Sequence, residues 1–325
     1  MSRILAGNDS KGETLPLNEK LLIDRIRRAA LGGSPGRSIG DDCAVLQVPR
    51  GHEALVTTDF SLEGVHFRRD WHPPDAVGHR CLARGLSDIA AMGGTPRAAF
   101  LSLALPADLP QAWVDRFIAG LLKLASWYSV RLAGGDTAQS PDGVLADIVV
   151  LGSVPAGRAV LRSGARPGDF IFVTGTLGSA IAVLHRLREG EKLDPKSHPK
   201  HFYPEPRLAA GQFLRAKKLA SAMIDISDGL STDLGHICEE SKTGALVYAE
   251  SLPAAADKDG LTFALHGGDE YELLFTARPD RRIPRQIAGV PVTRIGEIVR
   301  GRQLRLAGAN GKTQILRPAG WEHFA

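Results

Sequence analysis

The chain has 325 residues, of which 43% are hydrophobic, 23% charged and 6% aromatic, and its formal net charge is +4. This length is sufficient for two domains of ordinary size, and the composition is typical of a soluble globular protein rich in glycine. Because the charge is small and the lysines and arginines are scattered, nucleic acid is not an expected partner.

Cysteine usage and the distribution of apolar residues predict the compartment. Cys43, Cys81 and Cys238 are far apart, without the paired spacing of a zinc site or a redox dithiol, so we expect a reducing, cytoplasmic location. The first 20 residues lack the apolar stretch of a secretion signal, and no apolar run approaches the roughly 20 residues that span a membrane. We therefore expect no membrane partner, and a flexible tail at residues 1–16.

Strand-like and helix-like segments alternate along the chain, which predicts an α/β fold with mixed layers in both halves. Strands are predicted at 54–58, 98–105, 147–154, 170–174, 245–249 and 271–276. Helices are predicted at 75–92, 109–128, 179–187, 205–223 and 229–241. Residues 155–168 follow neither period and carry three glycines and two prolines, so we divide the chain into domains 17–157 and 158–325.

Short acidic clusters stand beside glycines or apolar segments. They include Gly40-Asp41-Asp42, Gly134-Gly135-Asp136-Thr137 and Asp225-Ile226-Ser227-Asp228-Gly229. A carboxylate that is partly desolvated near other carboxylates needs a counter-charge, or it protonates. Mg²⁺ suits such a cluster because it prefers oxygen ligands and bridges carboxylates to phosphate oxygens. The clusters therefore suggest a site with several metal ions for a polyphosphate.

Each acidic position also has a structural explanation. Asp42 could be a turn residue, and Asp59 could simply end the strand that contains Thr57 and Thr58. Asp88 could form an ion pair with Arg84 one helical turn earlier, and Ser227 or Asp228 could cap a helix. The segment 308–313 resembles a phosphate-binding loop, but its spacing is wrong, and a turn between two strands is expected there.

In order along the chain, these motifs resemble the thiamine-monophosphate kinase family, of the superfamily that includes aminoimidazole ribonucleotide synthetase and selenophosphate synthetase. The resemblance runs from residue 37 to Trp321. It rests on Ile39-Gly40-Asp41-Asp42-Cys43-Ala44, Thr57-Thr58-Asp59, Gly64-Val65-His66-Phe67, Leu86-Ser87-Asp88-Ile89-Ala90-Ala91-Met92-Gly93, Gly134-Gly135-Asp136-Thr137, residues 162–169, residues 225–230 and residues 267–272.

The resemblance implies an enzyme that phosphorylates thiamine monophosphate with ATP and Mg²⁺. Implied metal ligands are Asp42, Thr57, Thr58, Asp59, Asp88, Asp136, Asp225 and Asp228, of which Asp42, Asp59, Asp88, Asp136 and Asp228 would be catalytic. Implied ATP contacts are Gly135, Asp136, Arg162, Ser227 and Tyr128. Implied contacts of the thiamine phosphate are His66, Asp269 and Trp321. Because many members have Glu-Asp where this chain has Asp269-Glu270, which of the two faces the substrate stays open.

The resemblance also implies a two-domain architecture. The sheet of the N-terminal domain would join two copies into a homodimer and carry the metal and nucleotide site, which the C-terminal domain would complete.

Direct phosphoryl transfer fits these residues. A phosphate monoester has its second pKa near 6, so the attacking oxygen is already largely deprotonated at neutral pH, and no strong general base is needed. What must be overcome is repulsion between anions, which metal-binding aspartates address and a Ser-His-Asp set does not. Three alternatives remain: a superfamily relative with another acceptor, a metal-dependent phosphatase, and a non-catalytic sensor of thiamine phosphate or nucleotide.

Overall fold

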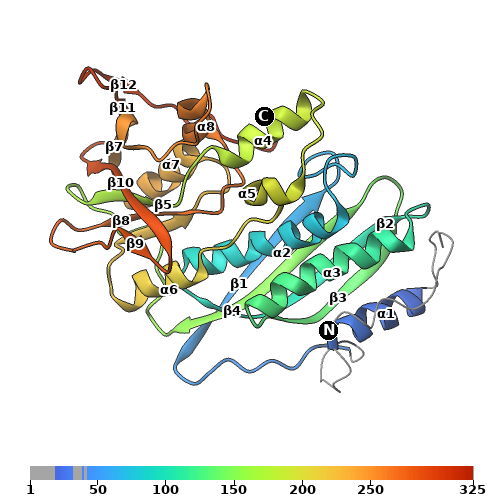
Figure 1. Ribbon diagram of the computed structural model, residues 1–325. Coiled ribbons are helices and arrows are strands. Elements are labelled where there is room, and N and C mark those ends of the chain that lie inside the picture. Colours follow the sequence, from blue (N-terminus) through green and yellow to red (C-terminus); the bar gives the residue numbers. More distant parts are fainter. Residues whose placement is uncertain (1–18, 32–38, 40–41, 325) are drawn as a thin grey trace.

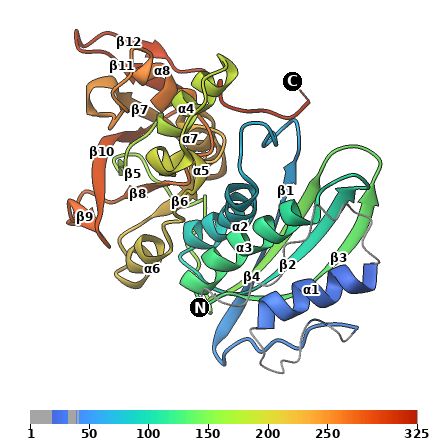
Figure 2. The same cartoon turned by 45° about the vertical axis from the view of Figure 1, so that its right-hand side comes forward.

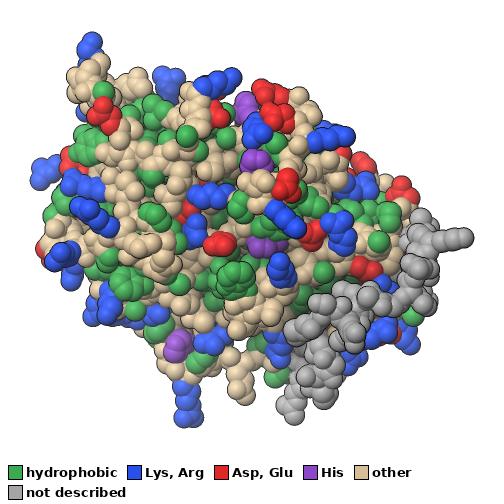
Figure 3. Space-filling view, in the orientation of Figure 1, with side chains coloured by type: hydrophobic (Ala, Val, Ile, Leu, Met, Phe, Trp, Pro, Cys, Tyr) green, Lys and Arg blue, Asp and Glu red, His purple; other side chains and the backbone are tan. Residues whose placement is uncertain are grey.

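A computed structural model describes residues 19–31, 39 and 42–324 of the chain (Figure 1). The tail expected at residues 1–16 lies outside the described residues, as do Gly40 and Asp41. Basic and acidic side chains are interspersed on the face shown in Figure 3. No helix of the described part is long and apolar enough to cross a membrane.

The N-terminal half is a four-stranded sheet with helices on one face. Its strands stand in the order β1-β4-β2-β3, so β1 and β3 are the edges, and only β2 and β3 are parallel. The strands are β1 (His52–Leu62), β2 (Thr95–Pro106), β3 (Arg131–Ser140) and β4 (Leu145–Pro155). The helices are α1 (Glu19–Leu31), α2 (Pro74–Ala91) and α3 (Gln111–Trp127). α2 and α3 run side by side across the sheet, and α1 lies near β3 (Figures 1 and 2).

The C-terminal half is a mixed sheet in the order β12-β11-β7-β10-β5-β8-β6, with β9 paired to β10. Its strands are β5 (Phe170–Thr174), β6 (Ala222–Asp225), β7 (Gly244–Tyr248), β8 (Leu273–Ala277), β9 (Gln286–Ile287), β10 (Val290–Val299), β11 (Leu304–Ala307) and β12 (Thr313–Ile315). Its helices are α4 (Ser179–Arg188), α5 (Pro199–Phe202), α6 (Leu208–Ala216), α7 (Leu230–Ser241) and α8 (Gly260–His266).

α2 is the central helix of the molecule. It packs against β1 and β4 of its own sheet, and it also contacts α6 and β6 of the C-terminal half. Its buried side chains form one continuous core with residues of both sheets, including Met223 and Phe275. The helix begins with Pro74 in its first turn, and it ends before Gly93, whose positive φ of 66° allows the backbone to turn away. Residues on α2 can therefore meet residues from either half.

Most predicted elements are confirmed, with small shifts at their ends, and so is the turn before β12. The division at residues 157 and 158 remains a prediction, and it falls in the segment between β4 and β5. The single helix predicted at 205–223 is wrong. α6 ends at Ala216, and β6 begins at Ala222, because Lys218 takes a left-handed φ of 53° and the apolar residues that follow are buried in the sheet.

β3 and β10 were not predicted. β3 carries Gly134 and Gly135, which are typical of a turn, yet both pair with β2 across a register shift. At Gly135 φ is 150°, and an added Cβ would lie 1.8 Å from the carbonyl oxygen of Leu101. The two glycines therefore allow a close approach between neighbouring strands of the sheet itself.

Close packing of α2 on α3 depends on two glycines. A Cβ at Gly120 of α3 would lie 2.0 Å from the carbonyl oxygen of Asp75, and a Cβ at Gly78 of α2 would lie 1.9 Å from that of Phe117. We expect Gly120→Ala to lower the free energy of unfolding by about 1–3 kcal/mol, because helix backbones would have to separate.

Gly235→Ala is the matched control for Gly120→Ala. It is also a helix-interior glycine, in α7, but its added Cβ would meet only Pro318 Cγ, at 3.8 Å. Helix propensity should then raise the stability by up to about 1 kcal/mol. Urea denaturation of both variants measures the difference, and equal effects of the two substitutions would contradict the packing argument.

Candidate active site

A cleft of about 1130 Å³ lies between the two halves and is lined by residues of both. β1, the loop after it and α2 contribute from the N-terminal half, while α4, the 225–228 and 266–271 segments and the end of the chain contribute from the C-terminal half. The C-terminal segment extends toward the end of β1 (Figure 2), where the ring centroids of His66 and His323 are 5.5 Å apart. The last residues of the chain therefore form one wall of the cleft.

Three of the predicted aspartates meet at α2. Thr57, two residues before Asp59 on the same face of β1, donates a hydrogen bond from its hydroxyl to Asp88 Oδ2. Ser87 directly precedes Asp88 on α2, and its hydroxyl donates to Asp225 Oδ2 at 2.6 Å. The close contacts of α2 with both β1 and β6 thus bring together carboxylates that are far apart in sequence.

These carboxylates repel one another in a desolvated place. Burial, and after it the charge of the neighbouring Asp88, raise the pKa of Asp59 to about 7. Burial also raises the pKa of Asp88, and burial together with the Asp88 charge raises that of Asp225 well above 3.8. The hydrogen-bond donors to Asp88 and Asp225 are neutral hydroxyls. Arg84 lowers the pKa of Asp59 and Arg162 lowers that of Asp88, but neither charge outweighs burial.

The chemistry of this donor set fits a hard divalent cation, since it consists of carboxylate and hydroxyl oxygens that need positive charge. Across residues 19–31, 39 and 42–324, however, no three His, Cys, Asp or Glu side chains already converge as in a formed metal centre. The metal roles of Thr57, Asp59, Asp88, Asp225 and Asp228 therefore remain a prediction. Asp228 also lines the cleft, and burial raises its pKa.

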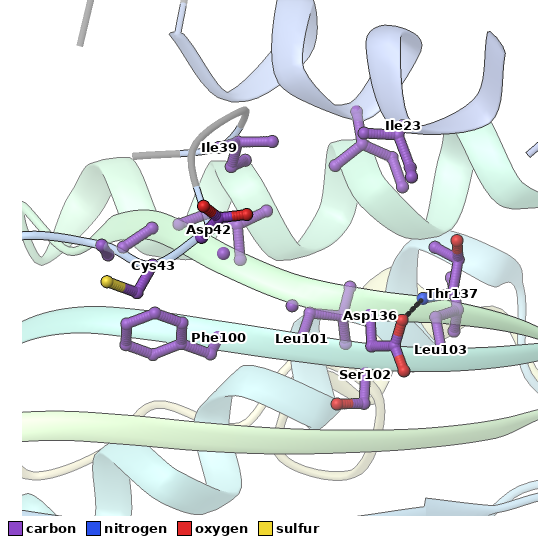
Figure 4. A pocket seen from close by; sticks show the side chains of 16 residues that line it. Ile23, Ile39, Asp42, Cys43, Phe100, Leu101, Ser102, Leu103, Asp136 and Thr137 are labelled. Atoms are coloured by element: carbon purple, nitrogen blue, oxygen red, sulfur yellow. Dashed lines mark hydrogen bonds between the residues drawn. The ribbon is translucent and has the colours of Figure 1, made fainter. Parts of the chain in front are cut away.

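The other predicted metal ligands lie elsewhere. Asp42 and Asp136 line a second pocket of about 600 Å³, beside β3 and α1 (Figure 4). There the Asp136 carboxylate accepts the Thr137 backbone N–H at 2.9 Å. Thr58 points away from α2, and its hydroxyl donates to Asp147 Oδ1 at 2.7 Å. Asp147 is not among the residues predicted for the site.

The pairing register separates the two acidic groups. Asp59 aligns across the sheet with Ile148, Leu101 and Gly135, whereas Asp136 aligns with Ser102, Asp147 and Phe60 in the neighbouring row. Adjacent rows face opposite sides of a sheet, and the two edge strands are roughly 14 Å apart, three strand spacings. A single chain therefore does not bring Asp59 and Asp136 to one metal site.

All three predicted contacts of the thiamine phosphate line the cleft. His66 is neutral, because burial and the Arg84 charge lower its pKa to about 4. Its Nδ1 accepts the Leu62 backbone N–H at 3.0 Å, which leaves a donor on Nε2. The Trp321 indole is 47% exposed, and its backbone N–H donates to the Asp228 carbonyl at 2.9 Å.

Of the acidic pair, Asp269 lines the cleft, and Glu270 points away from it. Glu270 Oε1 accepts the backbone N–H of Ala180 at the start of α4, at 2.9 Å. Asp269 Oδ2 accepts from Arg80 at 2.7 Å, while Oδ1 accepts from Arg84 at 3.2 Å and from the Tyr271 hydroxyl at 2.5 Å. Burial alone would raise the pKa of Asp269, but the two guanidinium groups outweigh it and hold the pKa low.

The predicted ATP contacts are dispersed. Arg162 and Ser227 line the cleft, whereas Gly135 and Asp136 line the second pocket. Tyr128 lines neither of them. Its hydroxyl donates to the Pro206 carbonyl at 3.1 Å, where α3 meets the loop before α6.

Several cleft residues escaped the sequence reasoning. The sequence offers Arg84 only as an ion-pair partner of Asp88, but the structure pairs it with Asp269. His72 and His201 lie with their Nε2 atoms 3.0 Å apart, and Arg80 donates to the His201 carbonyl. No local pattern marks these residues, because their partners are 121 to 189 positions away.

Comparison with known proteins places both halves of the chain. Residues 40–154 match the AIR synthase related protein N-terminal domain, and residues 166–308 match the AIR synthase related protein C-terminal domain. Thiamine-monophosphate kinase of Salmonella typhimurium is 39% identical, and the alignment covers 93% of this chain and 96% of that protein. The kinase of Synechococcus elongatus is 37% identical, over 89% of this chain and 92% of that one.

Solved structures agree with the sequence comparisons. A crystal structure of thiamine-monophosphate kinase from Stenotrophomonas maltophilia superposes with a TM-score of 0.79 at 36% identity, covering 93% of this chain and 99% of that one. A structure of AaThiL complexed with AMPPCP and TMP superposes with a TM-score of 0.76 at 33% identity, covering 96% and 99%. From its two domains and from these relatives, the chain belongs to the thiamine-monophosphate kinase family.

Proposed function

We propose that this chain transfers the γ-phosphoryl group of ATP to the phosphate of thiamine monophosphate. An oxygen of the acceptor phosphate forms a bond to the γ-phosphorus, and the bond from that phosphorus to the β,γ-bridging oxygen breaks. The products are thiamine diphosphate and ADP, and the leaving oxygen takes the bonding electrons. Because the attacking oxygen is already largely deprotonated at neutral pH, the chain needs no strong general base.

One observation carries the proposal. The desolvated aspartates at α2 share a single cleft with His66, Asp269 and Trp321. The aspartates suit a metal-bound polyphosphate, and the opposite wall offers the aromatic ring of Trp321 for an organic cation, the neutral imidazole donor of His66, and Asp269 with its two arginines. A family relative complexed with AMPPCP and TMP supports the same pair of ligands.

Mg²⁺ would be held by Asp59, Asp88, Asp225 and Asp228, with Thr57 beside them. When bound, it would neutralise phosphate charge and so allow two anions to approach in line. The chain's own contribution is placement. The Thr57 and Ser87 hydroxyls orient Asp88 and Asp225, and the core packing of α2 fixes their spacing.

We also propose a homodimer that forms through the open face of the N-terminal sheet. Val56 and Phe60 on this face of β1 are 65% and 57% exposed, and such large apolar side chains favour a covered surface. Asp136 lies on the same face, at the opposite edge from Asp59. An interface on this face would bring Asp136 close to the partner protomer, whereas Asp59 faces α2.

A cytoplasmic location completes the proposal, and it is supported by Cys43, Cys81 and Cys238, which are all free thiols.

Product analysis tests the proposed function. We expect purified protein with ATP, Mg²⁺ and thiamine monophosphate to yield thiamine diphosphate and ADP in equal amounts, as separated by chromatography. Reactions with thiamine, and without an acceptor, are the controls. ADP without thiamine diphosphate would indicate another acceptor or a phosphatase, and binding without turnover would indicate a sensor.

A further inference from the structure

Arg84 occupies a central place in the cleft. It lies on α2, one turn before Asp88, and its side chain is only 11% exposed. Arg84 and His66 line the same cleft, and the Arg84 charge lowers the pKa of His66. Arg84 thus stands between the acidic group at α2 and the wall formed by His66, Asp269 and Trp321.

Hydrogen-bond donors of Arg84 are left over. A guanidinium has five N–H donors, but within the described part of the chain Arg84 makes only two bonds, and both are long. They reach Asp269 Oδ1 at 3.2 Å and the Phe60 carbonyl at 3.4 Å. Arg80, one turn earlier, also makes two bonds, to the His201 carbonyl and to Asp269 Oδ2, and the bond to Asp269, at 2.7 Å, is shorter than either bond of Arg84. A mostly buried guanidinium that lines a cleft and has unused N–H donors is suited to bind an anionic ligand.

Asp269 holds Arg84 in place rather than saturating it. Its Oδ1 atom is shared between Arg84 and the Tyr271 hydroxyl. Asp269 and Tyr271 both adopt left-handed backbone conformations, with φ of 60° and 52°, which their side-chain contacts must maintain. With Arg80, Arg84 and Asp269 together the cluster keeps one net positive charge, which suits a phosphate monoester of charge about −1.5 to −2.

We propose that Arg84 binds the phosphate group of the acceptor, and that it thereby selects a phosphorylated acceptor over the unphosphorylated alcohol. This inference rests on the proposed function. The acceptor phosphate must reach both the aspartates at α2 and the wall that receives the organic part, and the Arg84 charge acts on both, on Asp59 and on His66.

Calorimetric binding of thiamine monophosphate and of thiamine tests this role, with the full chain, Mg²⁺ and a non-hydrolysable ATP analogue. We expect Arg84→Met to weaken binding of thiamine monophosphate and not of thiamine. The dissociation constant of thiamine divided by that of thiamine monophosphate should therefore fall at least about tenfold. The KM for thiamine monophosphate should rise by a similar factor, with the KM for ATP unchanged. Arg84→Lys keeps the charge without the planar guanidinium, so its ratio of dissociation constants should lie between those of the unsubstituted protein and of Arg84→Met.

Arg188→Met is the matched control, since it removes another cation that lines the same cleft. It should leave the ratio unchanged. Equal weakening of both ligands by Arg84→Met, or a reduced ratio in Arg188→Met instead, would overturn the assignment to Arg84. If the unsubstituted protein makes no thiamine diphosphate, the proposed function fails; if it does, and the ratio is insensitive to Arg84, only this inference fails.

Discussion

Replacing Asp59 by asparagine is expected to lower kcat for thiamine diphosphate formation by at least about 10²-fold, with the fold intact. The substitution keeps the shape of the side chain and removes its charge. Asp59 is the carboxylate of β1 that faces α2, beside Asp88. Loss of its charge should weaken binding of the cation that offsets phosphate repulsion. Steady-state kinetics over a range of Mg²⁺ concentrations measure the effect.

The same substitution should stabilise the metal-free protein. The pKa of Asp59 is raised from 3.8 to about 7 by burial and then by Asp88, so the folded state holds this proton more tightly than the unfolded chain. Ionised Asp59 therefore lowers stability progressively as pH rises from near 3.8 through about 7. We expect metal-free Asp59→Asn to melt at a higher temperature than the unsubstituted protein at pH 8, and the difference to vanish near pH 3.

With added Mg²⁺ the unsubstituted protein should melt at a higher temperature than Asp59→Asn at pH 8, because the ion stabilises the unsubstituted protein more than the variant. Asp280→Asn is the control, since the Asp280 side chain is 69% exposed and its carboxylate lies 4.0 Å from Arg281. It should change neither turnover nor the effect of Mg²⁺. Near-normal activity of Asp59→Asn at ordinary Mg²⁺, or an equal thermal shift with Mg²⁺ in both proteins, would exclude a role of Asp59 in metal binding.

Local patterns predicted the elements whose period and ends are marked in the sequence. α2 has a proline in its first turn and two glycines after it, and it was found within one residue at each end. β3 escaped because glycines that permit a close strand pair look like the glycines of a turn. The 205–223 segment failed for the opposite reason: its apolar residues continue past the helix into a buried strand.

For the candidate site, the resemblance identified residues, but not how a single chain arranges them. Asp88 and Asp225 meet because α2 contacts β6, a long-range packing fact that no local pattern contains. The separation of Asp59 from Asp136 follows from strand order, which was not predicted. The Arg80 and Arg84 pair was missed because a helix with apolar neighbours gives no sign that its arginines face a carboxylate almost 190 residues away.

Replacing Glu272 by glutamine should cause the largest loss of stability among these variants, about 3–5 kcal/mol. Glu272 is fully buried just before β8. Its carboxylate accepts two bonds from Arg207, each 2.7 Å long, one from Thr174 at 2.7 Å and one from Lys200 at 3.2 Å. Removing the charge leaves two cations without their buried partner, and it loosens the junction of α5, α6, β5 and β8.

The pH dependence of this loss identifies its cause. Burial would raise the pKa of Glu272, but Arg207 and Lys200 outweigh burial and lower it below 4.5. The charge therefore contributes its stability above pH 4.5, and that contribution is lost as pH falls through the lower pKa of the folded state. Urea denaturation should thus show a large difference between Glu272→Gln and the unsubstituted protein at pH 7, and a smaller one below pH 4.

Glu205→Gln is the matched control, because Glu205 contacts the same Arg207, at 3.6 Å, but is 63% exposed. Solvent screens such a pair, so its loss should change the free energy of unfolding by about 1 kcal/mol or less. Equal effects of the two substitutions would show that burial of Glu272 adds nothing to its ion pair. A much larger loss of stability in Glu272→Gln would show that the buried carboxylate of Glu272 stabilises the C-terminal half. Glu272 lies two residues beyond the acidic pair Asp269-Glu270, of which Asp269 faces the cleft.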